Sequence, residues 1–450
     1  MESELTTIHS SILDRQAFIK QLDIIKQASE LAQSKIDYNS AHDDNIIRAI
    51  DVVEDFLRKT HRLCYGGQAI NAHLPAKYKF YDPEFSIPDY DFFTPNHKTD
   101  IASLVKDLKK AGFTEISVRE GMHDGTIKIY VDYIPIADMT LIDSKLYRIL
   151  SKREYRTEGI SYLDANSLRM LMYLELSRPR GEVSRWPKVY ERLLLLNEFV
   201  PVRHCNVGRR IFNGGLRLEQ VEYTIAFIIE NKRVFAGADL LEFYSSMRAQ
   251  GIEWVISSRK PIIFFSPDVD ADSKILREEF NFLSKSDKKS IAIKSYSSRG
   301  TEILPFMKII TYGKKALVFI IEQTACNSYI NIPTADNKIL RIATIDTLIS
   351  LYFGLGLFDS KFYITESMEC LANNLVKLST EARTSATFPF PFISIRCAGH
   401  QTSLPSLIRA KVKRITQKKH ELKNILDNNK HNTRNTRNTR NTIRNRYAAK

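Results

Sequence analysis

The sequence is poor in cysteine and lacks any long apolar run. Its 450 residues include five cysteines, an odd number scattered without paired spacing: Cys64, Cys205, Cys326, Cys370 and Cys397. This pattern argues against a disulfide framework or a zinc ribbon and favours a reducing intracellular compartment. No run of 18 apolar residues occurs, and TLISLYFGLGLF at 347–358 is too short to span a bilayer. We therefore expect a buried helix end there and no membrane partner.

The start of the chain, MESELTTIHS, has neither a basic beginning nor an apolar stretch, so no secretory signal is expected. The composition, 43% hydrophobic and 26% charged, is that of an ordinary globular protein. A chain of this length predicts two or three hydrophobic cores.

The net charge of +14 is concentrated at one end of the chain. Residues 409–450 contain 14 Lys and Arg against Glu421 and Asp427, a net of +12, which leaves +2 for all preceding residues. The segment ends in a repeat, NTRNTRNTRNT, with almost nothing to bury, so we expect a disordered tail from residue 406. The repeat contains Arg434, Arg437 and Arg440. These arginines could bind RNA phosphates without distinguishing between bases, or could serve only solubility.

The apolar spacing predicts amphipathic helices at 11–35 and 43–60, with Ile46, Ile50, Val53 and Leu57 on one stripe. A strand ending at Tyr65, a helix, a strand near 90–93, a helix at 98–111 and an Asp-Gly hairpin at 123–126 follow. IKIYVDYIPIADMT is predicted to be one strand. Residues 151–258 indicate mainly helices, and PIIFF at 261–265 begins a second α/β region.

Two short stretches carry the chemistry. In YGGQAINAHLP, Gly66 and Gly67 stand at a strand-to-helix turn, where backbone N–H groups and the helix dipole favour phosphate oxygens. In IPDYDFF, Asp89 and Asp91 point to one face of a strand, about 6–7 Å apart at their backbones. Hard carboxylate oxygens suit Mg²⁺ that also binds substrate phosphates. Together the stretches predict a metal-dependent phosphate site.

A third carboxylate would complete such a site, and two are available. Asp132 and Asp138 share strand parity but lie about 20 Å apart along a strand, so only one can join the site. Pro135 lies between them and can change which face of the strand each side chain points to. The residues alone leave the choice open.

The stretch SRPRGEVSRWPK clusters four basic side chains around Trp186, as RNA-binding surfaces do. A solvated basic turn ahead of an apolar helix is the alternative interpretation. The four candidate RNA-binding residues are Arg178, Arg180, Arg185 and Lys188.

The order of the glycine pair, a helix, Asp-x-Asp and a later apolar-flanked Asp resembles the nucleotidyltransferase superfamily that includes DNA polymerase beta. YGGQAINAHLP, KFYDPEFSIPDYDFF, HDGTIKIYVDYIPIADMT and LRMLMYLELSRPRGEVSRWPKVYERLLLLN look like the poly(A) polymerase catalytic subunits of giant viruses and poxviruses. The resemblance extends over about residues 40–400. It implies that Gly66 and Gly67 bind the nucleotide and that Asp89, Asp91 and Asp138 are the catalytic metal ligands.

The sequence pattern and the resemblance together predict an α+β fold with five parts. These are an N-terminal helical segment (1–40), a polymerase-beta-like nucleotidyltransferase domain (41–150), a mainly helical middle region (151–258), a degenerate nucleotidyltransferase-like domain (259–405) and the basic tail (406–450).

The activity implied is template-independent transfer of AMP from ATP to the 3′ end of viral mRNA, with Mg²⁺ or Mn²⁺. The alternatives are a non-catalytic RNA-binding scaffold of the same fold and an enzyme for another nucleotide. The resemblance also implies a separate viral processivity partner or a homodimer, and a location in the host cytoplasm, in viral factories, extending to the virion.

Overall fold

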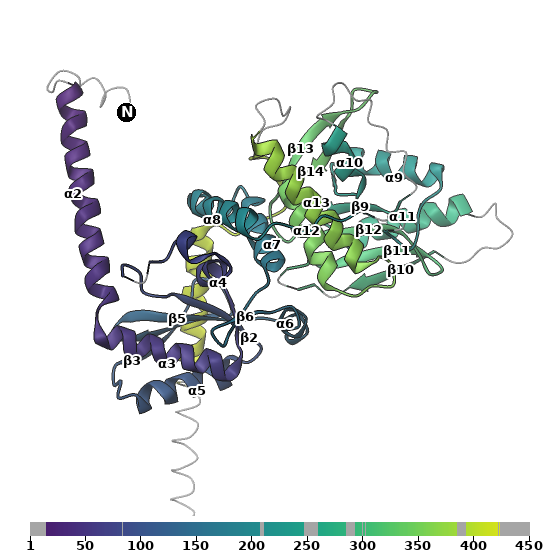
Figure 1. Ribbon diagram of the computed structural model, residues 1–450. Helices are drawn as coiled ribbons and strands as arrows, with labels where there is room; N and C mark the ends of the chain where they lie inside the picture. Colours follow the sequence, from purple (N-terminus) through teal and green to yellow (C-terminus); the bar gives the residue numbers. More distant parts are fainter. Residues whose placement is uncertain are drawn as a thin grey trace, which may run out of the picture.

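Two mixed β-sheets organise the protein. The computed structural model describes residues 15–82, 84–207, 211–246, 260–284, 293–298, 300–301, 303–384, 393–421 and 423. A seven-stranded sheet and an eight-stranded sheet form separate lobes, and helices α7 (Ala165–Leu176) and α8 (Trp186–Phe199) lie between them (Figure 1). The α+β class predicted from the sequence is confirmed.

The first sheet has the strand order β3-β4-β5-β2-β1-β7-β6. Strand β2 is parallel to β5 and antiparallel to β1, and β1 is parallel to β7. The strands are β1 (Leu63–Tyr65), β2 (Tyr90–Thr94), β3 (Ile116–Glu120), β4 (Thr126–Val131), β5 (Ile134–Leu141), β6 (Tyr155–Thr157) and β7 (Ile160–Tyr162).

Helix α3 (Asp44–Thr60) packs its apolar stripe into the core of the first lobe. The four residues of the predicted stripe are all buried, and Asp43 caps the helix by accepting from the N–H groups of Asn45 and Ile46. The other elements of this lobe are α4 (Gly66–His73), η1 (Ala76–Tyr78), α5 (His97–Lys110) and α6 (Ser144–Ser151). Helix α2 (Arg15–Ala41) projects away from the lobe (Figure 1).

The predicted single strand over IKIYVDYIPIADMT is wrong, because a two-residue turn divides it into β4 and β5. Asp132 and Tyr133 both have left-handed backbones, with φ of 49° and 68°. Such turns match the twist of a hairpin, but their usual signature is Asn-Gly or Asp-Gly. Asp132 therefore lies at a hairpin end and not within a strand.

The second sheet has the order β10-β11-β12-β9-β8-β14-β13-β15. From β10 to β13, its strand directions repeat those of the first sheet from β3 to β6. The strands are β8 (Val234–Phe235), β9 (Ile262–Ser266), β10 (Ile293–Ser298), β11 (Met307–Tyr312), β12 (Lys315–Glu322), β13 (Asn327–Pro333), β14 (Ile339–Ala343) and β15 (Cys397–Ala398).

This duplication lets the two sheets be compared residue by residue. Tyr65 opposes Asp91 and precedes Gly66 in the first sheet; extending the β8–β9 register by one residue places Ala236, which precedes Gly237, opposite Ile263. Asp91 pairs with Asp138, and Ile263 pairs with Phe319. The second sheet thus has apolar residues where the first has carboxylates, which supports the prediction of a degenerate second domain.

Helices surround the second sheet, and α12 is the most deeply buried of those described. Its segment, Ile345–Leu357, has only two residues that are not buried, so the predicted buried helix at this apolar stretch is confirmed. The other helices are α9 (Leu218–Glu230), α10 (Asp239–Ser246), α11 (Val269–Ser284) and α13 (Thr365–Thr384). No helix among the described residues is long and apolar enough to cross a membrane.

The predicted boundary at residue 150 and the separate region 151–258 are wrong. Strands β6 and β7 complete the first sheet, and β8 is an inner strand of the second. Their pairing was not visible in sequence because β6, β7 and β8 have only two or three residues each.

The two lobes are joined through α7. This helix packs against α12, and the Ser328 N–H at the start of β13 donates to the Ser177 carbonyl at the end of α7 (2.8 Å). Arg153 of the first lobe forms an ion pair with Glu369 of α13 (2.8 Å).

The expectation of a disordered tail from residue 406 is wrong for its first part, since residues 404–421 are helical. This C-terminal helix packs on the β3–β4 hairpin: Arg414 donates to the Met122 carbonyl (3.3 Å) and lies 3.5 Å from Asp124, and Lys418 pairs with Glu120. The tertiary contacts that stabilise it lie almost 300 residues away, which local composition does not reveal. Arg434, Arg437 and Arg440 lie outside the described residues.

The interpretation that the cysteines argue against disulfides is also wrong. Cys205 bonds Cys370 and Cys326 bonds Cys397, across sequence separations of 165 and 71 residues. Only Cys64, which is buried, is a free thiol. Pairs this far apart share no local spacing, so the fold alone brings them together.

Candidate active site

Gly66 forms the turn between β1 and α4. Its φ is +73°, a conformation that L side chains rarely adopt, and a Cβ there would lie 2.5 Å from Asp91 Oδ2. Tyr65 provides no side-chain cap for α4. The N–H groups of the first helical turn are therefore left for another acceptor, as the predicted phosphate site requires.

Gly67 makes room for an aromatic and basic cluster. A Cβ at Gly67 would lie 2.3 Å from the Tyr81 hydroxyl and 2.9 Å from Arg192 Nη1. Arg192 donates to that hydroxyl (2.9 Å) and lies over the Phe80 ring, 4.5 Å from its centroid. The guanidinium of α8 is thus positioned directly above the glycine turn.

The three predicted carboxylates lie on or next to two adjacent strands: Asp91 in β2, Asp138 in β5, and Asp89 just before β2. Asp91 and Asp138 are paired residues on adjacent parallel strands, so their side chains leave the same face of the sheet about 4.8 Å apart at the backbone. Asp89 lies two residues before Asp91, so its side chain points to the same face of the extended backbone. The structure brings Asp138, and not Asp132, to this site; Asp132 is exposed at the hairpin turn.

Asp138 is oriented by Lys128 of β4. The ammonium pairs with Asp138 Oδ2, while Oδ1 is buried and has no hydrogen-bond partner among the described residues. A buried carboxylate oxygen without a partner is costly, and a divalent cation would satisfy it. The oxygen donors present here therefore fit Mg²⁺ or Mn²⁺.

The carboxylates affect each other's ionisation. Burial, and then the charges of Asp89 and Asp138, raise the pKa of Asp91 to about 7. Burial and the Asp138 charge raise the pKa of Asp89. Within the described ranges, no three His, Cys, Asp or Glu side chains are already gathered for a metal ion. A bound cation would relieve this mutual repulsion and draw the carboxylates together.

The predicted basic cluster separates into different environments. Lys188 lies close enough to Asp89 to interact with it, and the neighbouring charge of Arg192 lowers the pKa of Lys188. Arg185 is paired with Glu175 (3.2 Å). Trp186 is half-buried and its indole N–H donates to the Glu175 carbonyl, so its ring is part of the fold.

Arg178 and Arg180 lie apart from Arg185 and Lys188. Arg180 is exposed on the turn, and Arg178 lines a pocket at the junction of the two lobes. Of the four predicted RNA-binding residues, Lys188 interacts through its charge with Asp89, and Arg185 with Asp91.

Sequence reasoning missed Lys128, Tyr81 and Arg192. Lys128 stands opposite Asp138 in the β4–β5 register, so a correct hairpin assignment would have indicated it. Arg192 follows Lys188 by one helical turn, which is the available signal for a shared face. Tyr81 lies in irregular backbone, and its sequence carries no such signal.

The segment that contains this candidate site is similar to known proteins. Residues 51–182, which hold both glycines and all three aspartates, match the family model for the poly(A) polymerase catalytic subunit. A candidate poly(A) polymerase catalytic subunit of African swine fever virus is 28% identical over 177 residues, covering 38% of this chain and 37% of that protein. A mimivirus counterpart is 27% identical over 185 residues, covering 40% of this chain and 30% of that protein. The matched segment thus spans about a third of the length of these relatives.

The fold is that of the Megavirus polyadenylate synthase. The crystal structure of that protein matches with a TM-score of 0.70, covering 91% of this chain and 84% of that one, at 17% identity. The likeness therefore includes both lobes, and the resemblance seen in the sequence is confirmed.

Proposed function

We propose that the protein is a template-independent poly(A) polymerase that transfers AMP from ATP to the 3′ hydroxyl of RNA. The observation that carries this proposal is the register of Asp91 with Asp138 beside the Gly66 turn, which joins a carboxylate pair to a phosphate-binding helix start. The names of the proteins matching 51–182 support the choice of reaction. A scaffold would have no use for adjacent carboxylates beside a glycine turn that leaves no room for a side chain.

In the proposed reaction, the RNA 3′ oxygen bonds to the α-phosphorus of ATP, the α–β phosphoanhydride bond breaks, and pyrophosphate leaves. The N–H groups at the start of α4 would bind the phosphates, with Lys188 and Arg192 offsetting their charge. Asp89, Asp91 and Asp138 would hold Mg²⁺ or Mn²⁺, which favours ionisation of the 3′ hydroxyl and stabilises the leaving pyrophosphate. Lys128 would keep Asp138 oriented.

The test is extension of a labelled RNA primer with each NTP separately, using Mg²⁺ or Mn²⁺. We expect long products with ATP alone and a loss of about a hundredfold or more in Asp91→Asn and Asp138→Asn. Asp132→Asn is the matched control, because it neutralises an exposed aspartate in a left-handed turn that Asn tolerates.

Extension with another NTP would mean that the enzyme adds that nucleotide rather than AMP. Absence of extension with every NTP, together with intact RNA binding, would support the scaffold alternative.

A further inference from the structure

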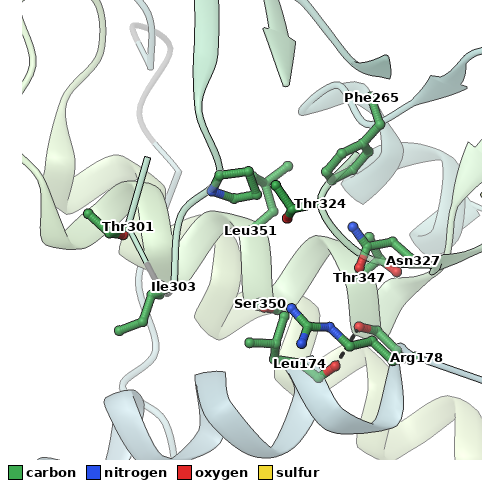
Figure 2. Close-up of a pocket in the computed structure, with 12 residues that line it drawn as sticks. Leu174, Arg178, Phe265, Thr301, Ile303, Thr324, Asn327, Thr347, Ser350 and Leu351 are labelled. Carbon is green, nitrogen blue, oxygen red and sulfur yellow. Dashed lines mark hydrogen bonds between the residues drawn. The ribbon is translucent and has the colours of Figure 1, made fainter. Parts of the chain in front are cut away.

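A small pocket lies where the two lobes meet, apart from the carboxylates. It is lined by the end of α7, the first turns of α12, the start of β13 and the loop before β11 (Figure 2). The cavity has a volume of about 30 Å³. This holds a few waters or the oxygens of one phosphate, but not a nucleoside.

Arg178 provides a cation in this pocket, and no ion pair of its guanidinium is recorded in the part of the chain that the structure describes. It extends from the end of α7 into the space that Figure 2 shows, and its buried Nε has no hydrogen-bond partner among the described residues. Glu175 of α7, whose charge acts on Arg178, forms its ion pair with Arg185. Burial lowers the pKa of Arg178, yet not enough to discharge a guanidinium at neutral pH.

Two further buried polar side chains line the same pocket without hydrogen bonds that the structure records. Ser350 of α12 is 4% exposed and Asn327 of β13 is 9% exposed. Arg178 Nε is buried and without a partner within the described ranges, and the Ser350 hydroxyl and Asn327 amide line the same opening, so a ligand with several acceptor oxygens could bind all three. The positive end of the α12 dipole adds to the preference for an anion.

We propose that this pocket, which we call the Arg178 pocket, binds a single phosphate group at the junction of the lobes. The guanidinium would donate to the phosphate oxygens, and Ser350 and the Asn327 amide would donate to the others. Because Arg178 lies just after α7, which lies between the lobes, and Ser350 belongs to α12 of the second lobe, a bound phosphate would link these two segments. The group could be a free phosphate or a backbone phosphate of RNA.

Thermal unfolding of the full chain tests the site without any transfer reaction, so its outcome is independent of the proposed activity. Sodium phosphate would be titrated against sodium chloride of equal ionic strength. We expect phosphate to raise the unfolding midpoint of the wild type, and Arg178→Gln to weaken the apparent phosphate affinity about tenfold or more. Ser350→Ala should show a smaller loss.

Lys274→Gln is the matched control, because it removes an equal charge from an exposed position on α11. Without phosphate, Arg178→Gln should unfold at or above the wild-type midpoint, since it removes an unpaired buried charge rather than a protein contact. Equal responses to phosphate in the wild type and in Arg178→Gln would overturn the proposal.

A second arm identifies the source of the phosphate. Binding of single-stranded oligoadenylate would be measured at several salt concentrations. If the pocket holds an RNA phosphate, Arg178→Gln should reduce the slope of log affinity against log salt by about 0.7. An unchanged slope, with phosphate stabilisation still lost, would assign the site to free phosphate.

Discussion

Gly66 meets two constraints at once, a left-handed backbone and a carboxylate at the distance where a Cβ would stand. The first constraint is local and the second depends on β2. Gly159 meets only the first, with φ of +79° in the β6–β7 turn and a Cβ position 3.4 Å from the flexible stem of Arg58. Substitutions at the two glycines therefore distinguish the effect of backbone strain from the effect of displacing Asp91.

We expect Gly66→Ala to abolish primer extension, because the methyl group must displace Asp91. Gly159→Ala should cost about 1 kcal/mol of stability with activity retained. Extension rates and unfolding midpoints of both variants check this. Equal activity losses in the two variants would show that strain alone, and not the Asp91 contact, determines the role of Gly66.

At the scale of elements, the sequence predicted what local pattern determines. The α3 stripe, the glycine turn and the buried α12 were correctly predicted because their periodicity or residue types suffice. The Asp132–Tyr133 turn was missed since neither residue is glycine, and that error hid the pairing of Lys128 with Asp138. The candidate site was thus predictable in its glycines and aspartates, but not in the basic side chains that fold over them.

The C-terminal helix (residues 404–421) shows the same limit, because its partner hairpin is remote in sequence. Most of its residues are exposed, so the contacts of Arg414 and Lys418 provide much of its attachment. Exposed ion pairs contribute only about 0–1 kcal/mol each. The helix should therefore detach readily from the hairpin.

We expect Arg414→Gln with Lys418→Gln to increase amide hydrogen exchange in residues 404–421 and in the β3–β4 hairpin, most clearly at low salt. Lys413→Gln with Lys419→Gln is the matched control, because these two exposed lysines are on the same helix and have no recorded ion pair among the described residues. Equal exchange in both double variants would mean that apolar packing alone holds the helix.

At the scale of the molecule, covalent links supplement the contacts between lobes. The Cys205–Cys370 bond joins the segment after α8 to α13 of the second lobe, beside the Arg153–Glu369 ion pair that also connects the lobes. Cys326–Cys397 joins the start of β13 to β15, next to Asn327 of the Arg178 pocket. Both bonds thus fix segments near the junction of the lobes.

Loop-closure entropy predicts that these bonds contribute substantially, because they close long loops. Loops of this size correspond to up to about 4–5 kcal/mol each from constraint of the unfolded chain. We expect Cys205→Ala to lower the unfolding midpoint of the oxidised protein. Reductant should then lower the midpoint of the variant less than that of the wild type, because the Cys205–Cys370 bond is already absent. Non-reducing peptide mapping should recover both pairs and leave Cys64 as the single thiol, protected in the folded state by its burial. Five titratable thiols after denaturation without reductant would contradict this, and would mean that non-covalent contacts alone hold the lobes together.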